Sequence, residues 1–155
     1  MKNKILTALL LFIVLLGIDQ YIKYIFVSGF EWHSEVFSLV LTYNYGVAFS
    51  MFAFLAENLK YIQIAILTIG LIYLAVNKEV FAHYYLPVSM LFAGGISNIA
   101  DRFIHGGVVD YFYWHYGFDF AIFNLADVII DCAVVLIFWE QYQIYKKEKA
   151  LKSKQ

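Results

Sequence analysis

Residues 5–27 read ILTALLLFIVLLGIDQYIKYIFV, a long run that is apolar except for a few polar positions near its end. About 20 apolar residues are enough for a helix to cross the hydrocarbon core of a bilayer. Lys2 and Lys4 precede the run as in a signal peptide, but no cleavage site of the Ala-x-Ala type follows it. We therefore expect residues 5–27 to form a retained membrane-spanning helix.

The composition of the whole chain also indicates a membrane protein. Of its 155 residues, 63% are hydrophobic, 20% are aromatic and only 15% are charged, which differs from the usual mixture of a soluble domain. Three more apolar runs follow, at about residues 59–76, 85–104 and 120–145. Backbone groups in lipid must be satisfied within their own segment, so all four runs should be helices. The sequence predicts an all-α membrane protein with four transmembrane helices in a single domain, residues 1–155.

The connection between the first two runs, at about residues 28–50, is expected to be partly extended. Its stretch VFSLVLTY at residues 36–43 alternates between apolar and polar positions, which is typical of a strand. We predict a small extracytoplasmic β platform there. In the later connection, an aromatic group is interpreted as a belt at the outer interface, with direct substrate contact as the alternative: Tyr111, Tyr113, Trp114 and Tyr116.

The basic residues predict how the chain is oriented in the membrane. With four spans, the N-terminal lysines, Lys78 and the lysine-rich tail at residues 146–155 share one side. Positive charge accumulates on the cytoplasmic side of membrane proteins, so both termini are expected to be cytoplasmic. From the net charge of −1 and the apolar composition, no nucleic-acid partner is expected.

Polar residues recur at helical spacing inside the apolar runs. One set in the third run consists of Asn98, Asp101, Arg102 and His105, and one in the fourth of Asn124, Asp127 and Asp131. Residues three and four apart share a helix face, and charges within the bilayer are costly, so both faces should point inward. Asp19 and Lys23 are expected to form an ion pair, structural or catalytic. Asp131 is expected to be structural, hydrogen-bonded by a neighbouring helix or by that pair. The alternative is that its negative charge raises the apparent pKa of Asp110 and Asp127 by like-charge repulsion.

Asp110 and Asp127 are the best candidates for acid–base chemistry. A short connection joins them, and if they lie close together they cannot easily both ionise, so the pair would share one proton. Such a pair can activate water for attack on an amide carbonyl. Inward-facing acids fit two other classes as well: a small proton-coupled transporter or channel subunit, and a noncatalytic assembly factor.

Five stretches of the chain match a known family in the right order: DQYIK at 19–23, NYGVAFS at 44–50, GGISNIADR at 94–102, GVVDYF at 107–112 and FNLAD at 123–127. Over nearly its whole length the chain resembles the lipoprotein signal peptidases, the type II signal peptidases of bacterial cytoplasmic membranes. The resemblance implies an aspartic endopeptidase that cuts a prolipoprotein on the amino side of its diacylglyceryl-modified cysteine. It also implies contact with membrane lipids and inhibition by the cyclic peptide globomycin.

The resemblance also assigns roles to individual residues. Asp110 and Asp127 match the catalytic aspartates, Asn44, Asn98, Arg102 and Asn124 match polar residues of the substrate pocket, and Asp19, Lys23 and Asp101 match a supporting shell. Two positions depart from the family pattern: Ser97 replaces a usual Gly, and Ala121 a common Pro. These departures are expected to affect loop geometry rather than the reaction.

No cofactor or metal ion is expected in the site. The histidines at positions 33, 83, 105 and 115 lack the spacing of a zinc site. Cys132 is the only cysteine, so neither a disulfide within the chain nor a cysteine-based metal site is expected.

Overall fold

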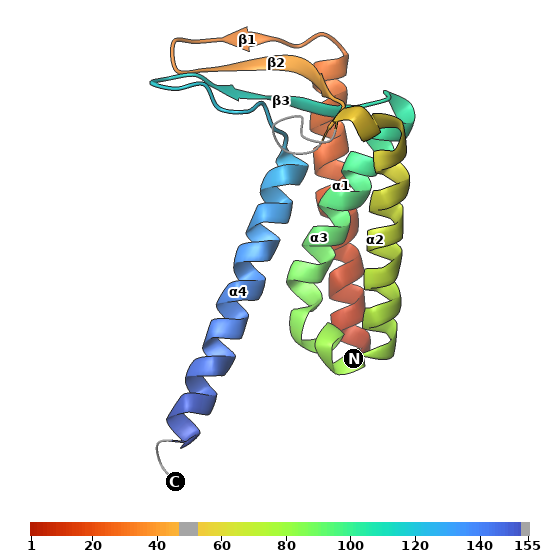
Figure 1. Ribbon diagram of the computed structural model, residues 1–155, viewed down its shortest axis with the longest axis vertical. Coiled ribbons are helices and arrows are strands. Elements are labelled where there is room, and N and C mark those ends of the chain that lie inside the picture. The colour runs from red at the N-terminus through yellow and green to blue at the C-terminus, as the bar shows by residue number, and fades with distance from the viewer. Residues whose placement is uncertain (47–52, 153–155) are drawn as a thin grey trace.

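The computed structural model describes residues 1–46 and 53–152, in which long helices carry a small sheet at one end (Figure 1). The helices are α1 Lys2–Val27, α2 Ala56–Val76, α3 Lys78–Ile104 and α4 Leu125–Lys152, with a short 3₁₀ helix, η2, at Ala53–Leu55. The strands are β1 Trp32–His33, β2 Phe37–Asn44 and β3 Val108–Trp114. In Figure 1, α1, α2 and α3 run side by side, α4 leans away from them, and both termini lie opposite the sheet.

The distribution of side chains is the reverse of that in a soluble protein. Much of the buried set is polar or charged: Asp19, Lys23, Ser97, Asn98, Asp101, Arg102, Asp110 and Asn124. The exposed set is rich in large apolar side chains on α1 and α2, such as Leu9, Ile13, Ile66 and Ile69. Within the described residues, α1, α2 and α3 are long and apolar enough to cross a membrane. Apolar surface faces lipid at no cost, while polar groups in lipid must be paired inside the protein.

All four expected helices are present, but their bounds differ from the prediction. The helices α1 and α2 each begin three residues early, α4 ends at Lys152 instead of residue 145, and the starts of α3 and α4 differ by more. The third begins at Lys78 instead of residue 85 and bends at Tyr84 (φ −102°, ψ 20°). Pro87 explains the bend, because a proline ring clashes with the carbonyl four residues before it. The fourth begins at Leu125 instead of residue 120, because Phe123 is extended and forms a β-bridge with Phe112.

The predicted strands between α1 and α2 are confirmed, but the sheet also contains a strand that the sequence analysis missed. The strands form an antiparallel sheet in the order β1-β2-β3, with Thr42 opposite Asp110 and Asn44 opposite Val108. β3 therefore comes from the connection between α3 and α4. The last four positions of the predicted platform, 47–50, lie outside the described residues.

Tyr111 shows why the aromatic-belt interpretation was wrong for part of this segment. Its side chain is buried and its ring stacks on Phe26 of α1 with centroids 4.3 Å apart. Its hydroxyl accepts a hydrogen bond from the backbone N–H of Leu125 at 3.0 Å. Tyr111 therefore ties the sheet to α1 and to the start of α4.

Gly94 allows α3 and α4 to approach each other closely near the start of α4. A Cβ atom at this position would lie 2.7 Å from the carbonyl oxygen of Ala126 and 2.7 Å from Cγ1 of Ile130. Only glycine fits such a distance without a backbone shift. The first turn of α4 is thus pinned against α3.

Candidate active site

Asn124 and Asp127 cap the start of α4 reciprocally. The Asn124 side-chain oxygen accepts the Asp127 backbone N–H at 2.9 Å, and the Asp127 carboxylate accepts the Asn124 backbone N–H at 3.2 Å. This is the geometry of a capping box, which satisfies two of the free N–H groups at a helix start. The local sequence therefore fixes the position of the Asp127 carboxyl group relative to the helix.

Asp110 lies on β3 and shares Asn124 with Asp127. The Asn124 side-chain amide donates to Oδ1 of Asp110 at 2.7 Å, while Asn44 of β2 donates to Oδ2 at 3.0 Å. Asn98 of α3 donates to Oδ1 of Asp127 at 2.9 Å. Asparagine side chains thus hold both carboxyl groups, and Asn124 contacts both of them.

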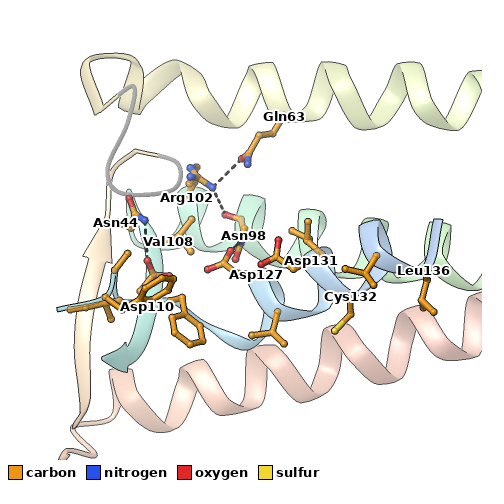
Figure 2. A pocket seen from close by; sticks show the side chains of 17 residues that line it. Asn44, Gln63, Asn98, Arg102, Val108, Asp110, Asp127, Asp131, Cys132 and Leu136 are labelled. Atoms are coloured by element: carbon orange, nitrogen blue, oxygen red, sulfur yellow. Dashed lines mark hydrogen bonds between the residues drawn. The ribbon is translucent and has the colours of Figure 1, made fainter. Parts of the chain in front are cut away.

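Both aspartates line one cavity of about 860 Å³. Figure 2 shows Asp110 near the sheet, followed along the cavity by Asp127, Asp131 and Leu136. The polar part of the lining comes from Asn44, Gln63, Asn98, Arg102, Asp110, Asp127 and Asp131, and much of the remainder is apolar. A long apolar groove with a few polar groups at one end suits an elongated amphipathic ligand.

Arg102 forms the positively charged wall of the cavity. Its Nη2 donates to the carbonyl oxygen of Gly46 at 2.5 Å, and its Nη1 to the side-chain oxygen of Gln63 at 3.1 Å. Its Nε is buried and has no hydrogen-bond partner among the residues described. Gln63 is a site residue that the sequence analysis missed, because a single glutamine within an apolar run carries no motif.

An ion network lies buried behind the two aspartates. Lys23 forms ion pairs with Asp19 at 2.8 Å and with Asp101 at 2.7 Å, and donates to Oδ1 of Asn98 at 2.8 Å. The three ionised side chains are each at most 2% exposed. The predicted pairing of Asp19 with Lys23 is confirmed, and Asn98 joins this network directly to Asp127.

The environment of Asp110 favours its protonated form. Burial raises the pKa of Asp110 to about 6, and the negative charge of Asp127 adds to this rise. Hydrogen bonds from Asn44 and Asn124 and the charge of Lys23 act in the opposite direction. The carboxyl group is therefore suited to retain a proton up to mildly acidic pH and to release it near neutrality.

Two expectations about single residues, Asp131 and Ser97, were wrong. Asp131 is exposed toward the cavity and makes no hydrogen bond or ion pair with the described residues, although a partner had been expected. His105, the last residue of the set predicted to face inward, is half-buried beside the ring of Tyr43. Ser97 lies fully buried within α3, not in a loop whose geometry it could alter.

In residues 1–46 and 53–152, no three His, Cys, Asp or Glu side chains converge in a way that could hold a metal ion. The chemistry that the site itself offers is acid–base chemistry by two carboxyl groups, next to amide donors and one guanidinium group.

Comparison with known proteins gives consistent similarities. The family model described as Signal peptidase (SPase) II matches residues 11–143. The chain is 55% identical over 142 residues to the lipoprotein signal peptidase of Wolinella succinogenes, covering 92% of this chain and 97% of that protein. It is 43% identical to that of Helicobacter pylori strain Shi470, covering 98% and 97%. A bacterial membrane enzyme solved by the in meso method superposes with a TM-score of 0.76 at 27% identity, covering 88% of each chain.

Proposed function

Because the chain belongs to the signal peptidase II family, we propose that Asp110 and Asp127 are the catalytic pair with which it removes signal peptides from prolipoproteins. The protein is a membrane peptidase, and its substrates are prolipoproteins. The assignment of the pair depends above all on Asn124, which contacts both carboxyl groups at the polar end of the cavity.

The proposed reaction uses one proton shared by the two carboxyl groups. The ionised carboxylate takes a proton from a water molecule as the water oxygen attacks the carbonyl carbon of the scissile peptide bond. The protonated carboxyl group donates a hydrogen bond to the developing oxyanion. When the carbon–nitrogen bond breaks, a proton passes from the pair to the leaving amine, and the pair again holds one proton.

Asn44, Asn98, Asn124 and Arg102 are proposed to position the substrate peptide in this site. A peptide must be extended to be cut, so its N–H and C=O groups near the scissile bond need partners in an apolar environment. Side-chain amides supply both donors and acceptors, and the Arg102 guanidinium supplies further donors. Asp19, Lys23 and Asp101 are proposed to support the pair from behind without touching the substrate.

In the proposed topology, α4 crosses the membrane together with α1, α2 and α3. Both termini lie on the cytoplasmic side, and the sheet and the catalytic pair lie toward the extracytoplasmic face of the bacterial cytoplasmic membrane. The lysines of the tail then lie on the side where positive charge accumulates, next to anionic headgroups. The cavity lies partly along α4, so that the acyl chains of a substrate can remain in lipid.

The substrate is proposed to be the diacylglyceryl-modified precursor, cut on the amino side of the modified cysteine. We expect purified protein in detergent to shorten this precursor on a gel, and to shorten the same precursor without its diacylglyceryl group at least about tenfold more slowly, because each buried CH₂ of an acyl chain contributes about 0.8 kcal/mol. Equal turnover of the two precursors would contradict entry from the lipid phase. A cyclic peptide such as globomycin should compete with the lipidated precursor.

Activity should depend on pH through the shared proton. Since the pKa of Asp110 is raised to about 6, the pair loses its proton as pH rises through this region, and kcat/KM should then fall about tenfold per pH unit on the alkaline side. The measurement is kcat/KM for the lipidated precursor between about pH 4 and 9, with protein stability followed in parallel. A profile that stays flat well above the pKa of Asp110 would show that the proton is not needed.

A further inference from the structure

Two neutral side chains complete the buried ion network behind the catalytic pair. The Ser97 hydroxyl donates to Oδ2 of Asp19 at 2.5 Å. The Gln20 side-chain amide donates to the Ser97 hydroxyl at 2.8 Å and to Oδ1 of Asp101 at 2.9 Å. Ser97 is 0% exposed, so bulk water does not reach its hydroxyl group. Neither residue forms an ion pair, but Ser97 contacts the carboxylate of Asp19 and Gln20 contacts that of Asp101.

The carboxylates of Asp19 and Asp101 accept the same kinds of hydrogen bond. Asp19 and Asp101 each accept an ammonium N–H from Lys23 and one neutral side-chain donor, Ser97 for the former and Gln20 for the latter. Two carboxylates facing a single ammonium leave an excess of negative charge, and a buried charge is stable only when hydrogen bonds satisfy it. Ser97 supplies such a hydrogen bond to Asp19, and Gln20 supplies one to Asp101.

The third donor to each carboxylate is the backbone N–H of the residue just before one aspartate of the catalytic pair. Oδ1 of Asp19 accepts the backbone N–H of Ala126 at 2.8 Å, and Oδ2 of Asp101 accepts the backbone N–H of Val109 at 3.2 Å. Ala126 immediately precedes Asp127, and Val109 immediately precedes Asp110. The orientation of each supporting carboxylate thus fixes the backbone next to one catalytic aspartate.

We propose that Ser97, together with Gln20, is a positioning residue of the reaction. It fixes the rotation of the Asp19 carboxylate, and thereby the Ala126 N–H and the position of Asp127 relative to Asp110. This role rests on the proposed function of the pair. Ser97 touches neither the substrate nor the reacting atoms. It therefore affects how accurately Asp127 is placed relative to Asp110, and not how tightly the substrate binds.

The test compares Ser97→Ala with Ser89→Ala, a matched control. Ser89 is also buried on α3 and its hydroxyl also bonds to α1, at the carbonyl oxygen of Ala8, but it has no contact with the network. We expect Ser97→Ala to lower kcat about tenfold and to change KM less than about twofold, because small displacements of catalytic groups are costly. Ser89→Ala should leave both parameters within about twofold, although it too loses a buried hydrogen bond.

Two further variants separate positioning from simple destabilisation. Ser97→Thr keeps the hydroxyl group and should restore kcat to within about threefold of wild type. Gln20→Leu removes the donor to both Ser97 and Asp101, and should also lower kcat with little change in KM. A kcat for Ser97→Ala no lower than that of Ser89→Ala, or a loss seen only in KM, would overturn the positioning role, as would full activity of Gln20→Leu.

Asp127→Asn in the same assay distinguishes this inference from the assignment of the pair. If Asp127→Asn is inactive and Ser97→Ala is fully active, only the positioning role fails. If Asp127→Asn remains active, the assignment of the pair itself fails. Thermal unfolding of each variant in detergent gives the folded fraction by which kcat is normalised.

Discussion

We expect Asp110→Asn and Asp127→Asn each to lower kcat for cleavage of a lipidated prolipoprotein by about 10³-fold or more, because removing a general acid or base costs about 10²- to 10⁴-fold and the two groups act as a unit. Asparagine has nearly the shape of aspartate, and its oxygen can still accept the hydrogen bonds from Asn124 or Asn98 that hold the side chain. The variants should therefore fold normally and bind substrate. The measurement is single-turnover cleavage on a gel at saturating enzyme.

Asp119→Asn is the matched control for this pair. Asp119 is an exposed acid in the same connection as Asp110, and it accepts a hydrogen bond from the Tyr113 hydroxyl outside the cavity. Its replacement should change kcat by less than about twofold, as is usual for surface substitutions. If either variant of the pair cleaves at the wild-type rate while folded, that residue has no part in the chemistry.

We expect Lys23→Met to lower the free energy of unfolding by about 3–5 kcal/mol, the usual cost of removing one partner of a buried ion pair. Lys23 is 2% exposed, and its ammonium group bonds to Asp19, Asp101 and Asn98. Methionine fills a similar volume but leaves two buried carboxylates without a cation. The measurement is denaturant unfolding in detergent micelles.

Two comparisons test whether the missing charge is the cause. Lys2→Met, at the exposed start of the same helix, should change the free energy of unfolding by less than about 0.5 kcal/mol. The triple variant Lys23→Met/Asp19→Asn/Asp101→Asn removes the charged groups together and should recover part of the lost stability, because a neutral network has no unpaired ion. A triple variant less stable than Lys23→Met would argue against this electrostatic origin.

Much of the fold could be predicted from the sequence because lipid simplifies the problem. A run of apolar residues long enough to cross a bilayer is almost always a helix, so α1 and α2 were predicted to within a few residues. The spacing of Asn98, Asp101 and Arg102 also predicted correctly which face of α3 is buried. The two largest errors in helix starts are at α3, which begins before Pro87 at Lys78, and at α4, where an extended segment precedes Leu125.

The parts that could not be predicted depend on contacts between distant segments. Ser97 and Gln20 are 77 positions apart, and nothing in either local sequence indicates that they bond to each other. The strand β3 could have been recognised, since VVDYFYW is rich in β-branched and aromatic residues. Its apolar and aromatic character also fits an interfacial belt, and only pairing with β2 distinguishes the two.

The burial of the ion pairs between Lys23, Asp19 and Asp101 protects them from changes in the salt concentration outside the cell. Mobile ions screen charges only where solvent reaches them, over about 8 Å at physiological ionic strength. Lys23, Asp19 and Asp101 are sealed from solvent, so a rise in external salinity that weakens surface ion pairs leaves these bonds intact. In the proposed topology, the proposed catalytic pair faces the outside of the cell, and the salt there does not weaken the buried ion pairs that support it.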